Sequence, residues 1–141
     1  MRRHRRTEGA HPLPPSRERG AGLAEFALVM PVLLMILFGI IEFGFAFGRS
    51  QAIAAAAREG GRLASLSSTS PTEVSDRVDE ALGSTTFDGP PVVSVDPSGG
   101  CLGREGLSVT VTVTAPHRIT IPFVLDRDLS LTGRSVFRCE G

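Results

Sequence analysis

Two carboxylates border an apolar stretch near the start of this 141-residue chain, and they are its most unusual chemical feature. Glu25 precedes the sixteen residues 26–41, which carry no charged or hydrogen-bonding side chain, and Glu42 follows them. An ionised acid near the centre of a bilayer costs about 2.5–3.5 kcal/mol on insertion scales, so such a residue is a functional candidate with a partner to be found. For Glu42, at the outer end of the run, reaching out to water or headgroups is the simpler interpretation.

The remaining titratable residues do not converge on an active site. His117, next to a proline, is predicted to be a solvated turn residue. The acids Asp76, Asp79 and Glu80 are predicted to lie on a solvent-exposed helix face and to form no acid/base pair. Two widely spaced cysteines without a histidine cluster make no zinc site, and no glycine-rich loop precedes a helix as a phosphate site requires. We therefore predict a protein that is not an enzyme, with no cofactor, no metal and no nucleic-acid partner.

The two cysteines leave one alternative open. Cys101 and Cys139 both follow the apolar stretch, in a compartment that permits disulfides if that stretch crosses a membrane. An even pair favours one bridge, and two unpaired thiols are the other interpretation.

The apolar residues predict a membrane-spanning helix over residues 21–47. A bilayer core about 30 Å thick needs about 20 helical residues, and a buried helix of so small a soluble domain would show a polar stripe, which is missing here. Pro31 is tolerated in such a helix with a modest kink. Gly39, Gly44 and Gly48 lie in its outer half, and the last two have the small-xxx-small spacing that lets helices approach closely.

The sequence before this helix predicts its orientation. Residues 1–20 carry six Arg against two Glu, together with several prolines, which predicts a disordered basic leader that stays in the cytoplasm. The protein is then a single-pass cell-membrane protein with its C-terminal part outside the cytoplasm.

The outer part divides into a helical extension, residues 48–66, and a domain, residues 67–141. Alanines continue the helix to about Glu59, and Gly60-Gly61 is predicted to break it or form a hinge. Ser70-Pro71-Thr72-Glu73 is a capping box that opens an amphipathic helix ending at Gly83.

Alternating apolar and polar residues after residue 87 predict strands. The predicted strands lie at 92–95, 107–114, 119–123 and 130–139, with turns at 97–100, 115–117 and 126–128 and a bulge or kink at Gly133. The fold class is therefore α+β: a long N-terminal membrane helix that continues outside, then an amphipathic helix packed on an antiparallel sheet of three or four strands.

Three sequence blocks resemble a known family. They are Gly20-Ala21-Gly22-Leu23-Ala24-Glu25-Phe26 with the run that follows, then residues 38–44, then Ala56-Ala57-Arg58-Glu59-Gly60-Gly61-Arg62. The first resembles the processing site of type IV prepilins and pseudopilins, and all three together resemble the TadE-like proteins of the tight-adherence (Flp) pilus system.

This resemblance implies a processing site made of Gly20, Ala21, Glu25 and Phe26. A prepilin peptidase would cut after Gly20, Ala21 would become the new N-terminus, and Glu25 would be the acid at the fifth position of the mature chain. The ammonium at Ala21 and the Glu25 carboxylate, one helical turn apart, could offset each other within a chain or between subunits.

The resemblance also implies the function and the partners. It predicts a non-enzymatic minor pilin or pseudopilin that assembles through its N-terminal helix with other pilins and pilus assembly proteins in the membrane. The alternative is a membrane-anchored extracytoplasmic binding module that is never cleaved and joins no filament.

Overall fold

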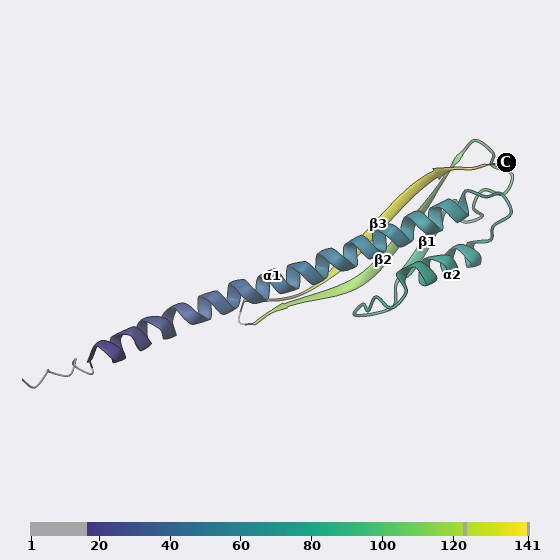
Figure 1. Ribbon diagram of the computed structural model, residues 1–141. Coiled ribbons are helices and arrows are strands. Elements are labelled where there is room, and N and C mark those ends of the chain that lie inside the picture. Colours follow the sequence, from purple (N-terminus) through teal and green to yellow (C-terminus); the bar gives the residue numbers. More distant parts are fainter. Residues whose placement is uncertain (1–16, 123, 141) are drawn as a thin grey trace, which may run out of the picture. The chain divides into compact units, whose positions relative to one another are not determined.

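The computed structural model describes residues 17–122 and 124–140, so most of the predicted basic leader lies outside the described residues. The chain divides into two compact units, with the boundary between Ile36 and Leu37. The described residues form two helices and three strands: α1 (Arg17–Ala64), α2 (Pro71–Leu82), β1 (Val92–Asp96), β2 (Ser108–Ile121) and β3 (Leu125–Arg138) (Figure 1). The predicted α+β class and the antiparallel sheet are confirmed, with three strands in the order β1-β2-β3.

Helix α1 is continuous over 48 residues and runs through Pro31 and through Gly60-Gly61. The predicted break at Gly60-Gly61 is wrong, because both glycines are buried where α1 meets its neighbours. A Cβ atom on Gly60 would lie 2.5 Å from Val78 of α2, and one on Gly61 would lie 2.7 Å from the Phe137 ring of β3. The missing side chains therefore let the helix pack closely against α2 and β3.

Helix α2 follows its local sequence signals fully. Ser70 accepts a hydrogen bond from the backbone N–H of Glu73, and the Glu73 carboxylate accepts one from the backbone N–H of Ser70, which completes the capping box. The bond from the Ser70 backbone N–H, together with one that the Ser70 hydroxyl donates at 3.0 Å, lowers the pKa of the exposed Glu73 carboxyl. The apolar face is buried, and Gly83 ends the helix with a positive φ of 56°.

Strands β2 and β3 form one long hairpin, and the turns predicted at 115–117 and 126–128 are wrong. Both segments lie inside strands, and the register runs without interruption from Ser108↔Arg138 to Ile121↔Leu125. Pro116 is tolerated because its backbone faces the edge of β2 that β1 does not cover, since β1 pairs with β2 only up to Thr114. On this edge the Pro116 carbonyl accepts a hydrogen bond from Asp88 N–H. The absent N–H of the proline therefore costs no ladder bond.

The unbroken register also shows that the predicted bulge at Gly133 is wrong. Gly133 pairs directly with Val113 and faces α1. A Cβ atom at this position would lie 2.8 Å from the backbone oxygen of Ile53. The glycine allows a close approach of α1 to the sheet.

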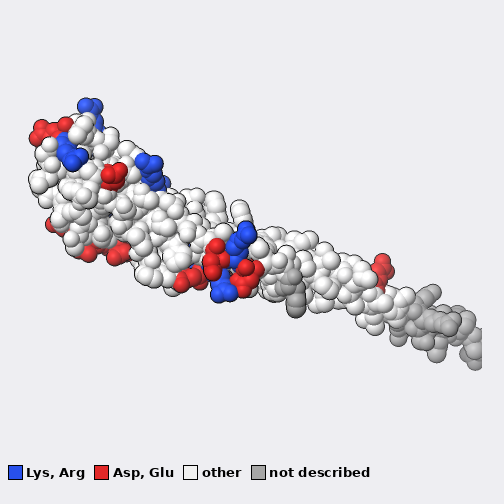
Figure 2. Space-filling model, turned by 180° about the vertical axis from the view of Figure 1, so that it is seen from behind, with Lys and Arg blue, Asp and Glu red and all other residues white. Residues whose placement is uncertain are grey.

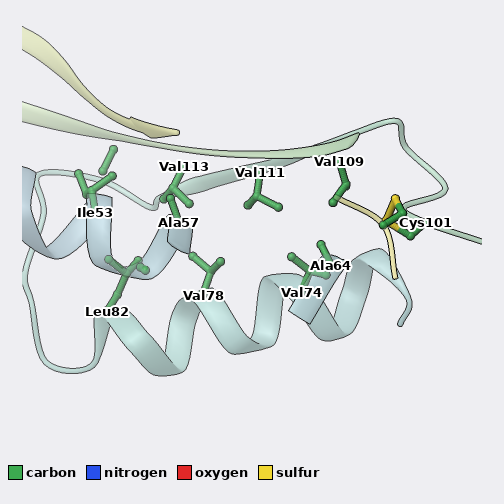
Figure 3. Close-up of a cluster of buried hydrophobic side chains, with 13 residues drawn as sticks. Ile53, Ala57, Ala64, Val74, Val78, Leu82, Cys101, Val109, Val111 and Val113 are labelled. Atoms are coloured by element: carbon green, nitrogen blue, oxygen red, sulfur yellow. A yellow bond between two sulfur atoms is a disulfide. The ribbon is translucent and has the colours of Figure 1, made fainter. Parts of the chain in front are cut away.

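The core lies between one face of the sheet and the two helices (Figure 3). All of its residues follow residue 52 in the chain. Alternate residues of β2 point inward, as the sequence predicts for Val109, Val111 and Val113. The helices and the disulfide complete this core with Ile53, Ala56, Ala57, Ala64, Val74, Val78, Leu82, Cys101 and Cys139.

Candidate functional site

The N-terminal part of α1 is exposed around its whole circumference. Every residue from Gly20 to Phe38 is exposed, and an 18-residue window of the helix reaches a mean hydropathy of 2.5 with none of it buried. The core of a soluble domain would bury such a segment. In the described part of the chain α1 is the one helix that is long and apolar enough to cross a membrane.

The predicted processing residues occupy the first turns of this helix. Gly20, Ala21, Glu25 and Phe26 are all exposed, and nothing lies within 4 Å of a Cβ atom built on Gly20 or Gly22. The bond between Gly20 and Ala21 lies close to the helix start at Arg17, where backbone N–H groups have no partner within the helix. Each glycine weakens a helix by roughly 1 kcal/mol relative to alanine, so unwinding this end would cost little.

The glycines in the outer half of the helix do not share one face. At about 100° per residue, Gly44 and Gly48 lie about 140° and 180° around the helix from Gly39. Half-buried or buried residues recur every three or four positions on the side of Gly39, which we call the domain-facing stripe: Gly39, Glu42, Ala46, Arg49 and Ile53. Gly44 and Gly48 are exposed on the opposite side, with open space at both Cβ positions.

The exposed glycines border a shallow groove of about 380 Å³. The groove is also lined by Phe45 and Arg49 of α1 and by the segment after α2, through Ser84, Thr85 and Thr86. The helix backbone is accessible here because the glycines carry no side chain. A second helix could therefore approach closely at this point.

Glu42 lies on the domain-facing stripe and is half-buried. Its position places the carboxylate on the side of α1 that the domain covers, away from the face of Gly44 and Gly48. Whether it reaches headgroups, as the sequence predicts, stays a prediction.

A polar cluster links α1 to the domain, and sequence reasoning missed it. The Arg49 guanidinium donates to the Asp88 carboxylate at 2.9 Å and lies 2.5 Å from His117 Nδ1. Because an arginine only donates, His117 Nδ1 is the acceptor of this contact. The backbone N–H of Arg118 also donates to Asp88 at 2.8 Å. That bond, with the nearby charge of Arg49, lowers the pKa of the Asp88 carboxyl.

The prediction that His117 is a solvated turn residue is wrong. His117 is 2% exposed, and its Nε2 has no hydrogen-bond partner among the described residues. The available signal was the alternation of β2, because positions 109, 111, 113 and 115 all point inward and 117 continues that series. The neighbouring proline hid it by suggesting a turn.

The two cysteines are bridged, which settles the alternative that the sequence left open. Cys101 and Cys139 form a disulfide across a sequence separation of 38 residues. The bridge ties the loop after β1 to the end of β3. Beside it, Glu140 N–H donates to the Ser65 carbonyl at the end of α1.

No catalytic arrangement stands out in residues 17–122 and 124–140. They contain no group of three or more His, Cys, Asp or Glu side chains that could hold a metal ion. A groove of about 500 Å³ lies between the end of α1, Arg77 and Glu140. Arg77 is already paired there with Glu59 at 3.1 Å and Glu80 at 2.8 Å, both of which raise its pKa.

Residues 20–62 match the sequence model of the TadE-like protein family. The match covers the exposed apolar part of α1 and its extension up to Gly60-Gly61, and it ends before α2. No curated protein and no solved structure shows significant similarity to this chain.

Proposed function

Taking the chain as a TadE-like protein, we propose that it is a non-enzymatic, minor pilin-like or pseudopilin-like component of a tight-adherence (Flp) pilus or a related secretion system. The observation that carries the proposal is the family match over residues 20–62, which coincides with the exposed apolar stretch of α1. Family membership suggests involvement in the pilus system. The minor-pilin role is our extension of it.

We place α1 across the cell membrane with its N-terminus in the cytoplasm. The excess of Arg in residues 1–20 supports this orientation, since basic flanks stay inside. The disulfide between Cys101 and Cys139 supports an oxidising compartment for the outer domain. Both observations agree on the same topology.

Assembly in this proposal proceeds through two features of α1. After cleavage by a prepilin peptidase, the Ala21 ammonium and the Glu25 carboxylate offset each other, and the pair sets the axial register of packed helices. At the outer end, Gly44 and Gly48 let the helix of another pilin or pilus assembly protein approach the backbone closely. The remaining exposed apolar surface of α1 contacts lipid.

The first experiment tests the role of Glu25. The full chain and its Glu25→Ala and Glu25→Gln variants are expressed in native membranes, and co-purifying pilus proteins are identified by mass spectrometry. Glu25→Ala should insert normally and lose its partners, and Glu25→Gln, which keeps the shape without the charge, should lose them too. Retention of partners by both variants would remove Glu25 from assembly.

The second experiment tests the glycine face. The double variant Gly44→Leu/Gly48→Leu should keep the fold, because nothing lies within 4 Å of either Cβ position, and should lose partner helices. Gly99→Leu is the matched control, with open space in a loop. If the double variant keeps its partners, the glycine face does not mediate the contact. If the wild-type chain stays uncleaved and brings down no pilus protein, the chain is better explained as a membrane-anchored binding module.

A further inference from the structure

The helices pack against one face of the sheet only. The core lies on that face, toward which the odd-numbered residues of β1, β2 and β3 point. The even-numbered residues point the other way and are exposed or half-buried, and we call their surface the open sheet face. Its rows of neighbouring side chains are Val92-Thr114-Thr132, Ser94-Thr112-Arg134, Asp96-Thr110-Val136 and, on two strands, Ser108-Arg138.

The open sheet face carries opposite charges on its two edge strands. Asp96 lies on β1, and Arg134 and Arg138 lie on β3. The two arginines flank Val136, which shares a row with Asp96. Because β2 lies between the edge strands and strands are about 4.8 Å apart, the two edges are about 10 Å apart. Arg138 Nε donates to the Gly106 carbonyl at 3.2 Å, but none of the three charges forms an ion pair with a described residue.

Hydroxyl groups line the open sheet face between the charged edges. Thr110, Thr112 and Thr114 alternate along β2, and Thr114 Oγ1 lies 3.4 Å from Thr132 Oγ1 of β3. A threonine hydroxyl both donates and accepts hydrogen bonds, so such a series can pair with an identical one. In the view of Figure 2, charged side chains are few and are separated by wide uncharged surface. On such a surface the positions of a few charges decide which partner fits.

A two-fold axis parallel to the strands makes the open sheet face complementary to itself. When two copies face each other across this axis, β3 of one copy lies opposite β1 of the other, and β2 lies opposite β2. Asp96 then lies between Arg134 and Arg138 of the second copy, and this contact occurs twice. Facing sheets stand about 10 Å apart, a gap that an aspartate and an arginine together reach across.

The direction of α1 selects this axis over the alternative one. Ile53 of α1 lies against Gly133 of β3, and Gly61 lies against Phe137, so residues 53–61 run in the same direction as β3. An axis parallel to the strands keeps this direction the same in both copies. An axis across the strands would reverse it in one copy, which two chains anchored at their N-terminal ends in one membrane do not permit.

We propose that the open sheet face is an interface between two copies of this chain, in which Asp96 of each copy binds Arg134 and Arg138 of the other. The proposal rests on α1 crossing the membrane, as proposed above, and involves no other pilus protein. Three strands and four rows make a face of roughly 15 by 25 Å, which is smaller than the roughly 800 Å² that each partner buries in a standard interface. The contact is therefore weak in solution, and confinement of both chains to one membrane supports it.

Energy transfer between labelled copies tests this contact in a membrane. The native cysteines are bridged, so Ser68→Cys, at an exposed site in the loop before α2, provides a single thiol for a donor or an acceptor dye. Full-length chains with either dye are mixed in phosphatidylcholine vesicles at low protein density. The fraction of chains in dimers is obtained from the transfer efficiency.

Charge reversal gives the expected pattern. Asp96→Arg and Arg134→Asp each place like charges opposite one another at both contacts, so each variant alone should lower the dimer fraction about tenfold or more. A mixture of donor-labelled Asp96→Arg and acceptor-labelled Arg134→Asp has opposite charges at both contacts and should regain the transfer of the wild-type chain. The matched controls Asp76→Arg on α2 and Arg127→Asp on the other face of β3 are exposed sites and should change nothing.

Recovery in the mixture would show that both variants are folded and that position 96 meets position 134 of the other copy. A mixture that transfers no better than its components would overturn the interface. So would a wild-type chain that shows no transfer. Transfer that is lost in Gly44→Leu/Gly48→Leu and kept in both charge variants would assign self-association to α1 and also overturn it. None of these outcomes depends on the co-purification of pilus proteins, so the proposed function stands or falls separately.

Discussion

Replacing Gly133 of β3 by alanine tests how α1 is seated on the sheet. The added Cβ would lie 2.8 Å from the Ile53 backbone oxygen and 2.9 Å from its backbone carbon, so no side-chain rotation could relieve the contact. Overpacking of this kind costs about 1–3 kcal/mol. Alanine is favoured over glycine inside a strand by about 0.5–1 kcal/mol, which offsets part of that cost. We expect a net loss of about 1 kcal/mol and a fall in melting temperature of roughly 4–8 °C for a domain of this size.

The assay is pulse proteolysis in urea on the full chain in detergent micelles, which measures the folded fraction at each urea concentration. Gly99→Ala is the control, since a Cβ atom at Gly99 has nothing within 4 Å, and it should leave the urea midpoint unchanged or slightly raised. If Gly133→Ala were as stable as Gly99→Ala, Ile53 would not pack against β3 as described.

Two further predictions concern the bridge and the polar cluster. Replacing Cys101 and Cys139 by serine should lower the free energy of unfolding by about 4 kcal/mol, the chain-entropy value for a separation of 38 residues, and reductant should reproduce this in the wild-type chain but not in the variant. Because folding lowers the pKa of Asp88, the ionised carboxylate stabilises the fold at pH values above its ordinary pKa of 3.8. This stabilisation is lost as the pH falls below that value and the carboxyl becomes protonated. Asp88→Asn should therefore weaken the attachment of Arg49 at neutral pH. It should also make the urea midpoint fall less steeply below about pH 4. If the urea midpoint of the variant fell as steeply there as that of the wild-type chain, Asp88 would not stabilise the fold as described.

Elements with local signals could be predicted from the sequence. Ser70, Pro71 and Glu73 specify the start of α2 within one turn, and the period-two alternation of Val109 to Val113 specifies the buried face of β2. These signals depend on neighbours in the chain, so no tertiary knowledge is needed.

The errors arose where one residue type serves two structural purposes. A glycine pair such as Gly60-Gly61 suits a hinge as well as a close helix contact, and only the position of Val78 and Phe137 in space decides between them. Pro116 likewise suits a turn as well as an edge position in a strand. The choice depends on β1 beginning at Val92, opposite Thr114, which the sequence around Pro116 does not encode.

The candidate site could likewise be predicted from the sequence only in part. The spacing from Gly20 to Glu25 is visible in the sequence, and the structure adds that these residues lie exposed at the start of α1. The opposite placement of Gly39 and Gly44 follows from helix geometry once the covered side is known. The contact between His117 and Arg49 is a tertiary property, because the two residues are 68 positions apart in the chain.

The most direct test of the central claim is the N-terminus of the protein in its own membranes. The full chain is extracted from native membranes, and its intact mass and N-terminal peptide are determined by mass spectrometry. A pilin-like component processed between Gly20 and Ala21 predicts a mature chain that begins at Ala21 with Glu25 as its fifth residue. A membrane-bound chain that retains residues 1–20 would contradict the processing on which the proposed assembly depends.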